Sequence, residues 1–240
     1  MSQAIAASLA TGDMTVHGRI VNASNNAMLV EVGTDDGAVL AVYKPLAGER
    51  PLWDFAYGTL HLREVAAYEV SNHLGWDLVP ETVLRDGPFG EGSVQRFIDH
   101  DPRCHYFALL DDPRHHEALR QMAAFDLVVN NADRKGGHVL RSPDQRIFGC
   151  DHGLTFHVEP KLRTVIWEFG GTPVDRAWQD DLRRLSADAV APGSGLTRRL
   201  APLIAPNEIE MLARRAAAVA SAGVLPDVAE DERPYPWPPI

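Results

Sequence analysis

Alternating hydrophobic and polar positions predict short strands near the start of the chain. The strands cover residues 14–21, 27–33 and 38–45, and polar turns separate them at residues 22–26 and 34–37. Successive strands that are joined by short turns pair in antiparallel fashion. This part of the chain is therefore predicted to form a small antiparallel sheet.

The hydrophobic spacing changes to a helical period after residue 58. Apolar side chains recur there on one face of a helix, and Gly75 provides a stop signal. The apolar positions are Leu62, Val65, Ala66, Val70 and Leu74. Two further strands are predicted within residues 79–86 and 92–99, because apolar residues again alternate with polar ones.

Helical patterns dominate the second half of the chain. They are clearest in residues 115–131, 174–186 and 207–223, and a proline-rich tail follows them. Prolines at this density disfavour regular secondary structure. The tail is therefore expected to be extended on the surface.

This order of elements predicts an α+β fold with two lobes. Residues 1–100 would form an N-terminal lobe with a sheet and one helix, residues 101–226 a mainly helical C-terminal lobe, and residues 227–240 the tail. A cleft between two such lobes would suit a nucleotide.

Composition and charge narrow the classes of partner. The chain has 240 residues, of which 45% are hydrophobic and 23% charged, as in ordinary globular proteins. Its net charge of -10 argues against nucleic acid and anionic membranes as bulk electrostatic partners. No signal peptide or membrane-spanning apolar run is recognisable. We therefore expect a soluble, cytoplasmic protein without stable membrane insertion, in which Cys104 and Cys150 are reduced thiols.

Lys44 is presented by the end of a strand with alternating character. It could contact phosphate oxygens as a point charge, or it could protect a sheet edge from aggregation. On the next helix, Glu64 could pair with Lys44 or be solvated, and Glu69 is a competing partner. In the first turn, Ser24 and Asn25 could cradle phosphates through backbone N–H groups, but this glycine-free turn could equally be a plain hairpin connection.

Two aspartates lie in polar loops beside apolar segments. Asp133 follows the apolar run FDLVV, and Asp151 follows the short run RIFGC. A carboxylate beside a buried segment is costly unless a metal, a basic group or a proton meets it. Phosphoryl transfer needs a divalent metal at the phosphates and a carboxylate near the acceptor hydroxyl. The two aspartates could fill these roles, or each could be an ordinary turn residue.

A family resemblance rests on segments between residues 14 and 170. They are AVYKP, LREVAAYEVSNHLGWDLVPET, GSVQRFI, NADRKGGHVL and DHGLTF. In this order they resemble the phosphatidylinositol 3- and 4-kinase superfamily, in particular the type II phosphatidylinositol 4-kinase branch with its bacterial relatives, and within it an actinobacterial subfamily. The resemblance implies a bilobal protein-kinase-like fold and ATP as phosphoryl donor.

The resemblance also implies roles for single residues. Lys44 would contact the nucleotide phosphates, Glu64 would hold that lysine, Asp133 would be the catalytic-loop aspartate, and Asp151 would bind the metal. The hinge whose backbone receives adenine would consist of Gln95, Arg96, Phe97 and Ile98.

Two histidines depart from the pattern of this family. His138 stands five positions after Asp133, where the family usually has an asparagine that binds the second metal. Because Mg²⁺ prefers oxygen ligands and imidazole suits Mn²⁺ better, we expect either a changed metal preference, a lost site or a structural role for His138. His152 replaces the phenylalanine that usually follows the metal-binding aspartate, and the sequence assigns it no role.

The acceptor is the least defined part of the functional prediction. The segment after Asp151 offers Lys161 and Arg163 as cations, which is sparse for a phosphoinositide head group. The main hypothesis is an ATP-dependent kinase that uses Mg²⁺ or Mn²⁺ and phosphorylates a hydroxyl of a protein or of a small soluble molecule. The alternatives are a nucleotide-binding pseudokinase that serves as an interaction module, a phosphatidylinositol kinase, and a nucleotidyl transferase.

Overall fold

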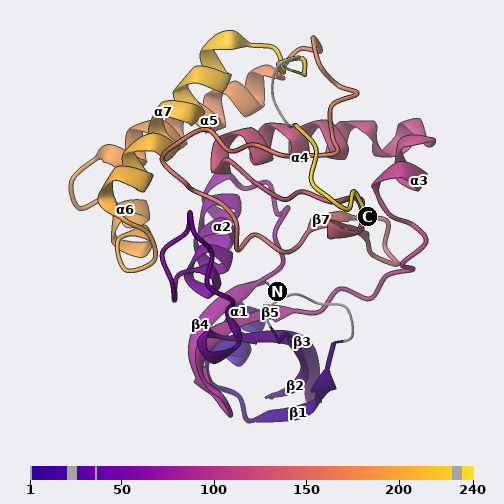
Figure 1. The fold of residues 1–240 in the computed structure, drawn as a ribbon, viewed down its shortest axis with the longest axis vertical. Coiled ribbons are helices and arrows are strands. Elements are labelled where there is room, and N and C mark those ends of the chain that lie inside the picture. Colours follow the sequence, from indigo (N-terminus) through magenta and orange to yellow (C-terminus); the bar gives the residue numbers. More distant parts are fainter. Residues whose placement is uncertain (1, 21–25, 36, 229–233) are drawn as a thin grey trace.

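The computed structural model describes residues 2–20, 26–35, 37–228 and 234–240. A curved sheet forms one end of the molecule and most of the helices form the other (Figure 1). The predicted α+β class with a sheet-containing lobe and a helical lobe is therefore confirmed.

The sheet has five antiparallel strands in the order β1-β2-β3-β5-β4. They are β1 (Met14–Arg19), β2 (Met28–Thr34), β3 (Gly37–Pro45), β4 (Thr82–Gly87) and β5 (Gly90–Arg96). Alternation along β3 sends Ala41 and Tyr43 into the core of this lobe, whereas Val42 and Lys44 line a cavity on the other face. All five predicted strands are present.

A helix that was not predicted covers part of the sheet. α1 (Ser2–Thr11) contacts β2, β4 and β5, and its Leu9 is buried in the core of this lobe. Arg85 of β4 donates hydrogen bonds to the carbonyl oxygens of Leu9 (3.0 Å) and Gly12 (2.8 Å). The guanidinium thereby satisfies carbonyl groups at the helix C-terminus and faces the negative end of its dipole.

α2 (Leu60–Leu74) joins the sheet to the helical lobe. It ends as predicted at Gly75, whose φ of 73° lies in the left-handed region that glycine adopts without strain. Arg63, on a buried turn of α2, donates to Glu208 (2.7 Å) and to the carbonyl oxygen of Thr155 (2.7 Å). These contacts fix α2 to the helical lobe.

The helical lobe contains one large apolar core around its long helices. The predicted helices correspond to α4 (His116–Val129), α5 (Arg176–Val190) and α7 (Pro206–Ala222), and α5 packs along α7. The other elements are α3 (Tyr106–Leu110), α6 (Gly195–Leu200), the 3₁₀ turns η1 (Leu46–Gly48), η2 (Pro113–His115) and η3 (Gly136–His138), and the hairpin strands β6 (Val139–Arg141) and β7 (Ile147–Gly149). Within the described part of the chain, no helix combines the length and apolar character that a membrane span requires.

Candidate functional site

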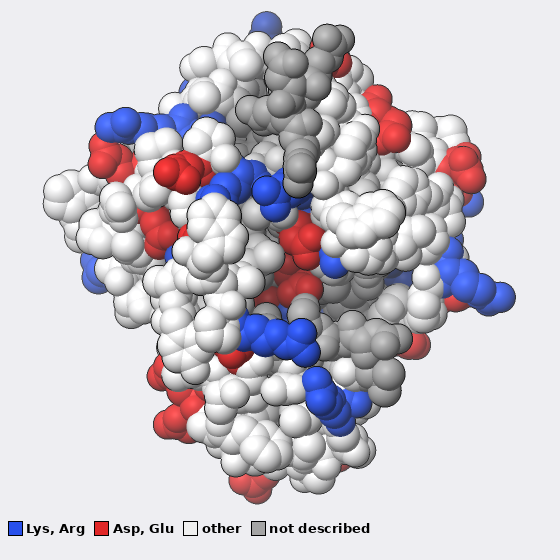
Figure 2. Space-filling model, viewed as in Figure 1, with Lys and Arg blue, Asp and Glu red and all other residues white. Residues whose placement is uncertain are grey.

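A cavity of about 570 Å³ lies between the sheet and the helical lobe. Val42 and Lys44 line it from the sheet, and Leu140, Cys150 and Asp151 line it from the helical lobe. Acidic side chains lie in the hollow between the lobes and basic side chains surround its rim (Figure 2). The volume falls within the range of about 300–1,000 Å³ that small-molecule sites occupy.

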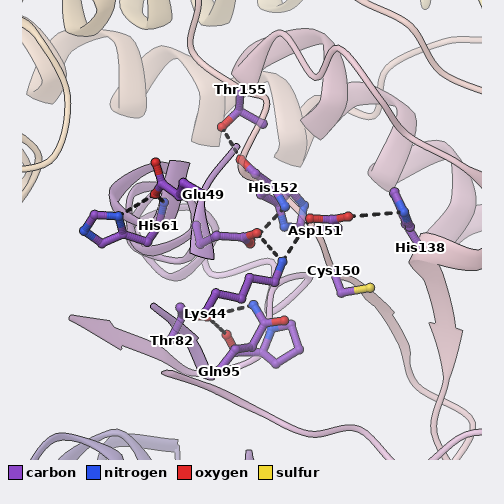
Figure 3. Close-up of polar contacts among 12 residues, drawn as sticks. Lys44, Glu49, His61, Thr82, Gln95, His138, Cys150, Asp151, His152 and Thr155 are labelled. Carbon is purple, nitrogen blue, oxygen red and sulfur yellow. Dashed lines mark hydrogen bonds and ion pairs between the residues drawn. The ribbon is translucent and has the colours of Figure 1, made fainter. Parts of the chain in front are cut away.

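Lys44 meets two carboxylates at the inner end of this cavity. Its ammonium group donates to Glu64 Oε1 in a short hydrogen bond and to Asp151 Oδ1 at 2.9 Å (Figure 3). Glu69, the competing partner, pairs instead with Arg199 at 2.5 Å. Burial alone would lower the pKa of Lys44, but the charges of Asp151 and Glu64 raise it above its usual value. The lysine is therefore held as a cation.

Asp151 is fixed by contacts on both sides of its backbone. Its φ of 57° is left-handed, which is unusual for a residue other than glycine. The N–H of Cys150 donates to the carbonyl oxygen of His138 (3.0 Å), and the N–H of His152 donates to Glu64 (2.9 Å). Burial would raise the pKa of Asp151, but Lys44 and His138 hold it well below its usual value, so the carboxylate is ionised.

Asp133 lies in the loop that follows α4, since the run FDLVV belongs to that helix. Its backbone N–H donates to Asn131 Oδ1 (3.0 Å), and its carboxylate lies 3.5 Å from the Lys135 ammonium. Burial, together with the charge of Asp151, raises the pKa of Asp133 to about 6 against the opposing effect of Lys135. A carboxylate with this pKa suits proton abstraction near neutral pH.

A fully buried ion pair organises this loop. Arg134 forms hydrogen bonds with both carboxylate oxygens of Asp126 on α4, at 2.9 Å for each of the closest contacts. It also donates to the carbonyl oxygen of Cys150 (2.9 Å) and to His152 Nε2 (2.7 Å). Arg134 therefore links the loop of Asp133 to the loop of Asp151.

This linkage gives His152 a structural role that the sequence did not reveal. The ring is fully buried and lies edge-on to Phe125 at 5.8 Å. Burial, and then the charge of Arg134, holds the pKa of His152 well below its usual value. The neutral ring accepts a hydrogen bond at a position where the phosphatidylinositol kinases that the sequence resembles have a phenylalanine.

His138 lies next to Asp151, as the hypothesis of a shared metal requires. Its Nε2 is 3.4 Å from Asp151 Oδ2 (Figure 3). Its Nδ1 faces the Lys135 backbone N–H at 3.4 Å. Burial lowers the pKa of His138 to about 4 despite the neighbouring Asp151, so the ring is neutral at pH 7. Because Nδ1 accepts from Lys135, the proton of the ring is on Nε2 and points at Asp151. The contact with Lys135 also matches the structural alternative, in which His138 braces the turn.

The predicted hinge residues all line the cavity, although each of them has a side-chain or backbone group that is bonded to another part of the protein. These residues are Gln95, Arg96, Phe97 and Ile98. Gln95 donates to Thr82 (2.8 Å), and Arg96 pairs with Glu81 (2.5 Å). The Phe97 N–H bonds to the Leu40 carbonyl oxygen, and the Ile98 carbonyl oxygen contacts His100 Nδ1. Ser24 and Asn25, predicted to cradle phosphates, lie outside the described residues.

The side chains around Asp151 can be tested for their fit to a divalent metal. Asp151 Oδ1 accepts from Lys44, and Oδ2 lies 3.4 Å from His138 Nε2. Among the described residues there is no group of three or more His, Cys, Asp and Glu side chains arranged to hold a metal ion. The arrangement fits an ion that takes further ligands from phosphate oxygens and water, as Mg²⁺ commonly does.

Three residues that organise the site were not singled out in the sequence. They are Asp126, Arg134 and Lys135, which all contact one another or Asp133. Asp126 had a detectable signal, because it interrupts the apolar run AAFDLVV and a buried carboxylate needs a partner. The signal does not say which basic residue that partner is.

Comparison with solved structures supports the protein-kinase-like fold. The structure of hydra Fam20 with sugar matches with a TM-score of 0.61 and 13% sequence identity, over 92% of this chain and 87% of that chain. The Helicobacter pylori proinflammatory kinase CtkA matches with a TM-score of 0.41 and 13% identity, over 90% of this chain and 94% of that chain, which is too distant to bear on the fold. The predicted bilobal, kinase-like fold class is thus confirmed.

Sequence comparison identifies a relative that spans nearly the whole chain. No family model matches the chain. Protein Rv2133c of Mycobacterium tuberculosis is 42% identical over 267 residues, which cover 96% of this chain and 93% of the relative. At this identity and coverage the two chains share a fold throughout, and the chain belongs to the same family as Rv2133c.

Proposed function

We propose that this protein is an ATP-dependent phosphotransferase. The observation that carries the proposal is the convergence of Lys44 from β3, Glu64 from α2 and Asp151 from the loop after β7 at the inner end of one cavity. A cation held by two carboxylates can exchange one of these partners for the phosphates of a nucleotide. Asp133, with a pKa of about 6, is the candidate for orienting or deprotonating the acceptor hydroxyl.

The nucleotide is proposed to enter with a divalent cation, Mg²⁺ or Mn²⁺. The base would lie against the hinge residues 95–98, and Lys44 would contact the phosphates. Asp151 is the proposed metal ligand through Oδ2. His138 is a second candidate, and its Nε2 would have to give up the proton that points at Asp151 before it could bind the ion. When bound, the ion would neutralise charge on the transferring phosphoryl group.

The proposed acceptor is a hydroxyl of a protein or of a small soluble molecule. Lys161 is engaged by Asp54 at 3.1 Å and lies 5.1 Å from the centre of the Trp53 ring, so it offers a phosphoinositide little free charge. Arg163 is exposed beside the catalytic loop, where its N–H and carbonyl group bond to the backbone of Asn131 and Arg134. A finer placement in the type II phosphatidylinositol 4-kinase branch is part of the proposal and rests on the sequence motifs.

Nucleotide binding is tested first by thermal unfolding with ATP and either metal. A ligand at one hundred times its dissociation constant stabilises a fold by about 2.7 kcal/mol, which gives a measurable rise in Tm. Lys44→Met should remove most of this rise. The absence of any shift at millimolar ATP with both Mg²⁺ and Mn²⁺ would count decisively against the proposal.

Group transfer is tested by incubation with ATP labelled at either the γ- or the α-phosphate. Transfer of the γ-label to the protein itself or to candidate acceptors, with loss in Asp133→Asn, is the expected result. Transfer of the α-label would indicate nucleotidyl transfer instead. ATP binding without any transfer would indicate a pseudokinase, and transfer to lipid vesicles alone would indicate a lipid kinase.

A further inference from the structure

Residues 234–240, which we call the strap, lie against the loop of Asp133 and against Thr164 and Trp167 of the helical lobe. The carbonyl oxygen of Pro234 accepts hydrogen bonds from the N–H of Thr164 (2.9 Å) and from Trp167 Nε1 (3.2 Å). The carbonyl oxygen of Pro239 accepts from the N–H of Gly136 (2.7 Å). The segment predicted to be a surface tail is therefore tied at both ends to the helical lobe.

The anchor at Gly136 depends on close packing. A Cβ atom at this position would lie 3.0 Å from the Phe107 ring and 3.4 Å from the Pro239 carbonyl oxygen. Gly136 follows Lys135 in the loop that carries Asp133, so the strap ends beside the proposed catalytic residues. In Figure 1 the C-terminal end of the chain lies beside β7 and in front of the helical lobe.

Two side chains of the strap belong to the wall of the nucleotide cavity. Pro238 and Ile240 line it together with Ile20 and Ala27 from the sheet lobe and Leu140 from the helical lobe. Ile240 nevertheless keeps 59% of its surface exposed. An exposed apolar side chain in the wall of a preformed cavity gains from contact with a ligand that covers it.

The strap bounds the cavity without filling it. The volume of about 570 Å³ is what remains with Pro238 and Ile240 in place. This is ample for a small-molecule ligand, for which sites of about 300–1,000 Å³ are usual. The strap therefore has the position of a wall and not of an autoinhibitory plug.

The wall of the cavity has both charged and apolar side chains. Lys44 and Asp151, with Arg96 and Lys135, supply charged groups, whereas the strap and the residues Ile20 and Ala27 supply apolar surface. Phosphates would be drawn to the first set, and the planar, less polar nucleoside to the second. We propose that the strap is part of the nucleotide site and that Pro238 and Ile240 contact the nucleoside portion of the bound nucleotide. This inference rests on the proposed function.

The test uses calorimetry to measure binding of the nucleoside part and of the phosphate part of the ligand separately. Dissociation constants for ATP, adenosine and inorganic triphosphate are measured with the same metal for the wild type, Ile240→Ala and the double variant Pro238→Ala/Ile240→Ala. Val190→Ala is a matched control, because Val190 is also β-branched and 56% exposed but is not part of the cavity wall. Thermal unfolding without ligand shows whether each variant is folded.

The double variant should bind ATP and adenosine about tenfold more weakly than the wild type. This is the combined loss expected from two apolar contacts at the rim of a cavity. Affinity for triphosphate should stay unchanged, as should all affinities of Val190→Ala. Unchanged ATP affinity, an equal loss for triphosphate, or a gain for ATP would each overturn the assignment. An equal loss for triphosphate would mean that the strap only braces the loop of Asp133. A gain in ATP affinity would mean that the strap obstructs the cavity.

Failure of the strap assignment is distinguishable from failure of the proposed function. If the wild type binds ATP and the double variant binds it equally well, the strap assignment alone is wrong. If the wild type binds none of the three probes with Mg²⁺ or Mn²⁺, both conclusions are wrong.

Discussion

Replacing Asp126 by asparagine tests whether the buried ion pair holds the loop of Asp133 in place. The substitution keeps the shape of the side chain but removes its charge and turns one acceptor into a donor that faces the Arg134 guanidinium. Both side chains are fully buried, so the arginine would remain charged without a counterion. Breaking a buried pair from one side costs about 3–5 kcal/mol.

The expected loss is large enough for routine measurement. For a chain of this size, about 1 kcal/mol shifts Tm by roughly 2–4 °C, so a decrease of about 6–20 °C is expected. Urea unfolding gives the free energy directly, provided that the slope with denaturant is unchanged. Asp101→Asn is a suitable control, because its pair with Arg103 lies at the surface, with the aspartate 38% and the arginine 89% exposed, and should change Tm only slightly.

A second variant separates the charge from the packing. Asp126→Leu combined with Arg134→Met removes both charges and should recover part of the stability. Recovery would be incomplete, because the carbonyl group of Cys150 and the ring of His152 lose their donor. If Asp126→Asn costs less than about 1 kcal/mol, as an exposed pair would, then the pair does not hold the loop as described.

Three further predictions concern the chemistry of the site. Lys44→Met should weaken ATP binding about ten- to hundredfold, the value of a charged hydrogen bond, and unchanged affinity by calorimetry would contradict its proposed contact. Because the pKa of Asp133 is raised to about 6, kcat/KM should fall as the pH drops below this value and the carboxylate becomes protonated. Asp133→Asn should lower turnover about 100- to 10,000-fold and abolish that acidic limb, and a retained limb would assign it to another group. His138→Asn should shift the metal preference from Mn²⁺ towards Mg²⁺ in parallel titrations, whereas loss of stability with an unchanged metal ranking would support the bracing role.

The parts of the fold that follow local periodicity could be predicted from the sequence. The strands up to Lys44 and the helix of Glu64 follow such patterns, and Gly75 marks the end of that helix. The contact of Lys44 with Glu64 could be anticipated from their order, while Asp151 as a second partner of Lys44 required the three-dimensional fold. α1 was not predicted because it is short and rich in alanine, which gives only a weak helical pattern of apolar positions. The burial of its Leu9 depends on the sheet against which it packs.

Features that depend on long-range packing could not be predicted in the same way. The pairing of Asp126 with Arg134 joins a helix interior to a loop, and sequence alone does not distinguish Arg134 from Lys135 as the partner. The role of His152 depends on that same arginine. The strap is proline-rich and has no periodic pattern. It is held by hydrogen bonds to its backbone carbonyl groups, which every sequence has, so its position could not be predicted from its side chains.

The anchoring of α2 through Arg63 determines which parts of the molecule can move as one body. Arg63 and Glu208 are both buried, so swinging α2 away from α7 would cost several kcal/mol. α2 is thus tied to the helical lobe while it also packs on β4 and β5, and a motion that widens the cavity with this tie intact would displace the sheet relative to α2. Such a motion would pull Lys44 from Glu64 and Asp151 together, so the ion pairs of Lys44 would resist it as long as no ligand is bound. An entering nucleotide would weaken these ion pairs by offering the lysine another anion, which couples ligand entry to the freedom of the sheet.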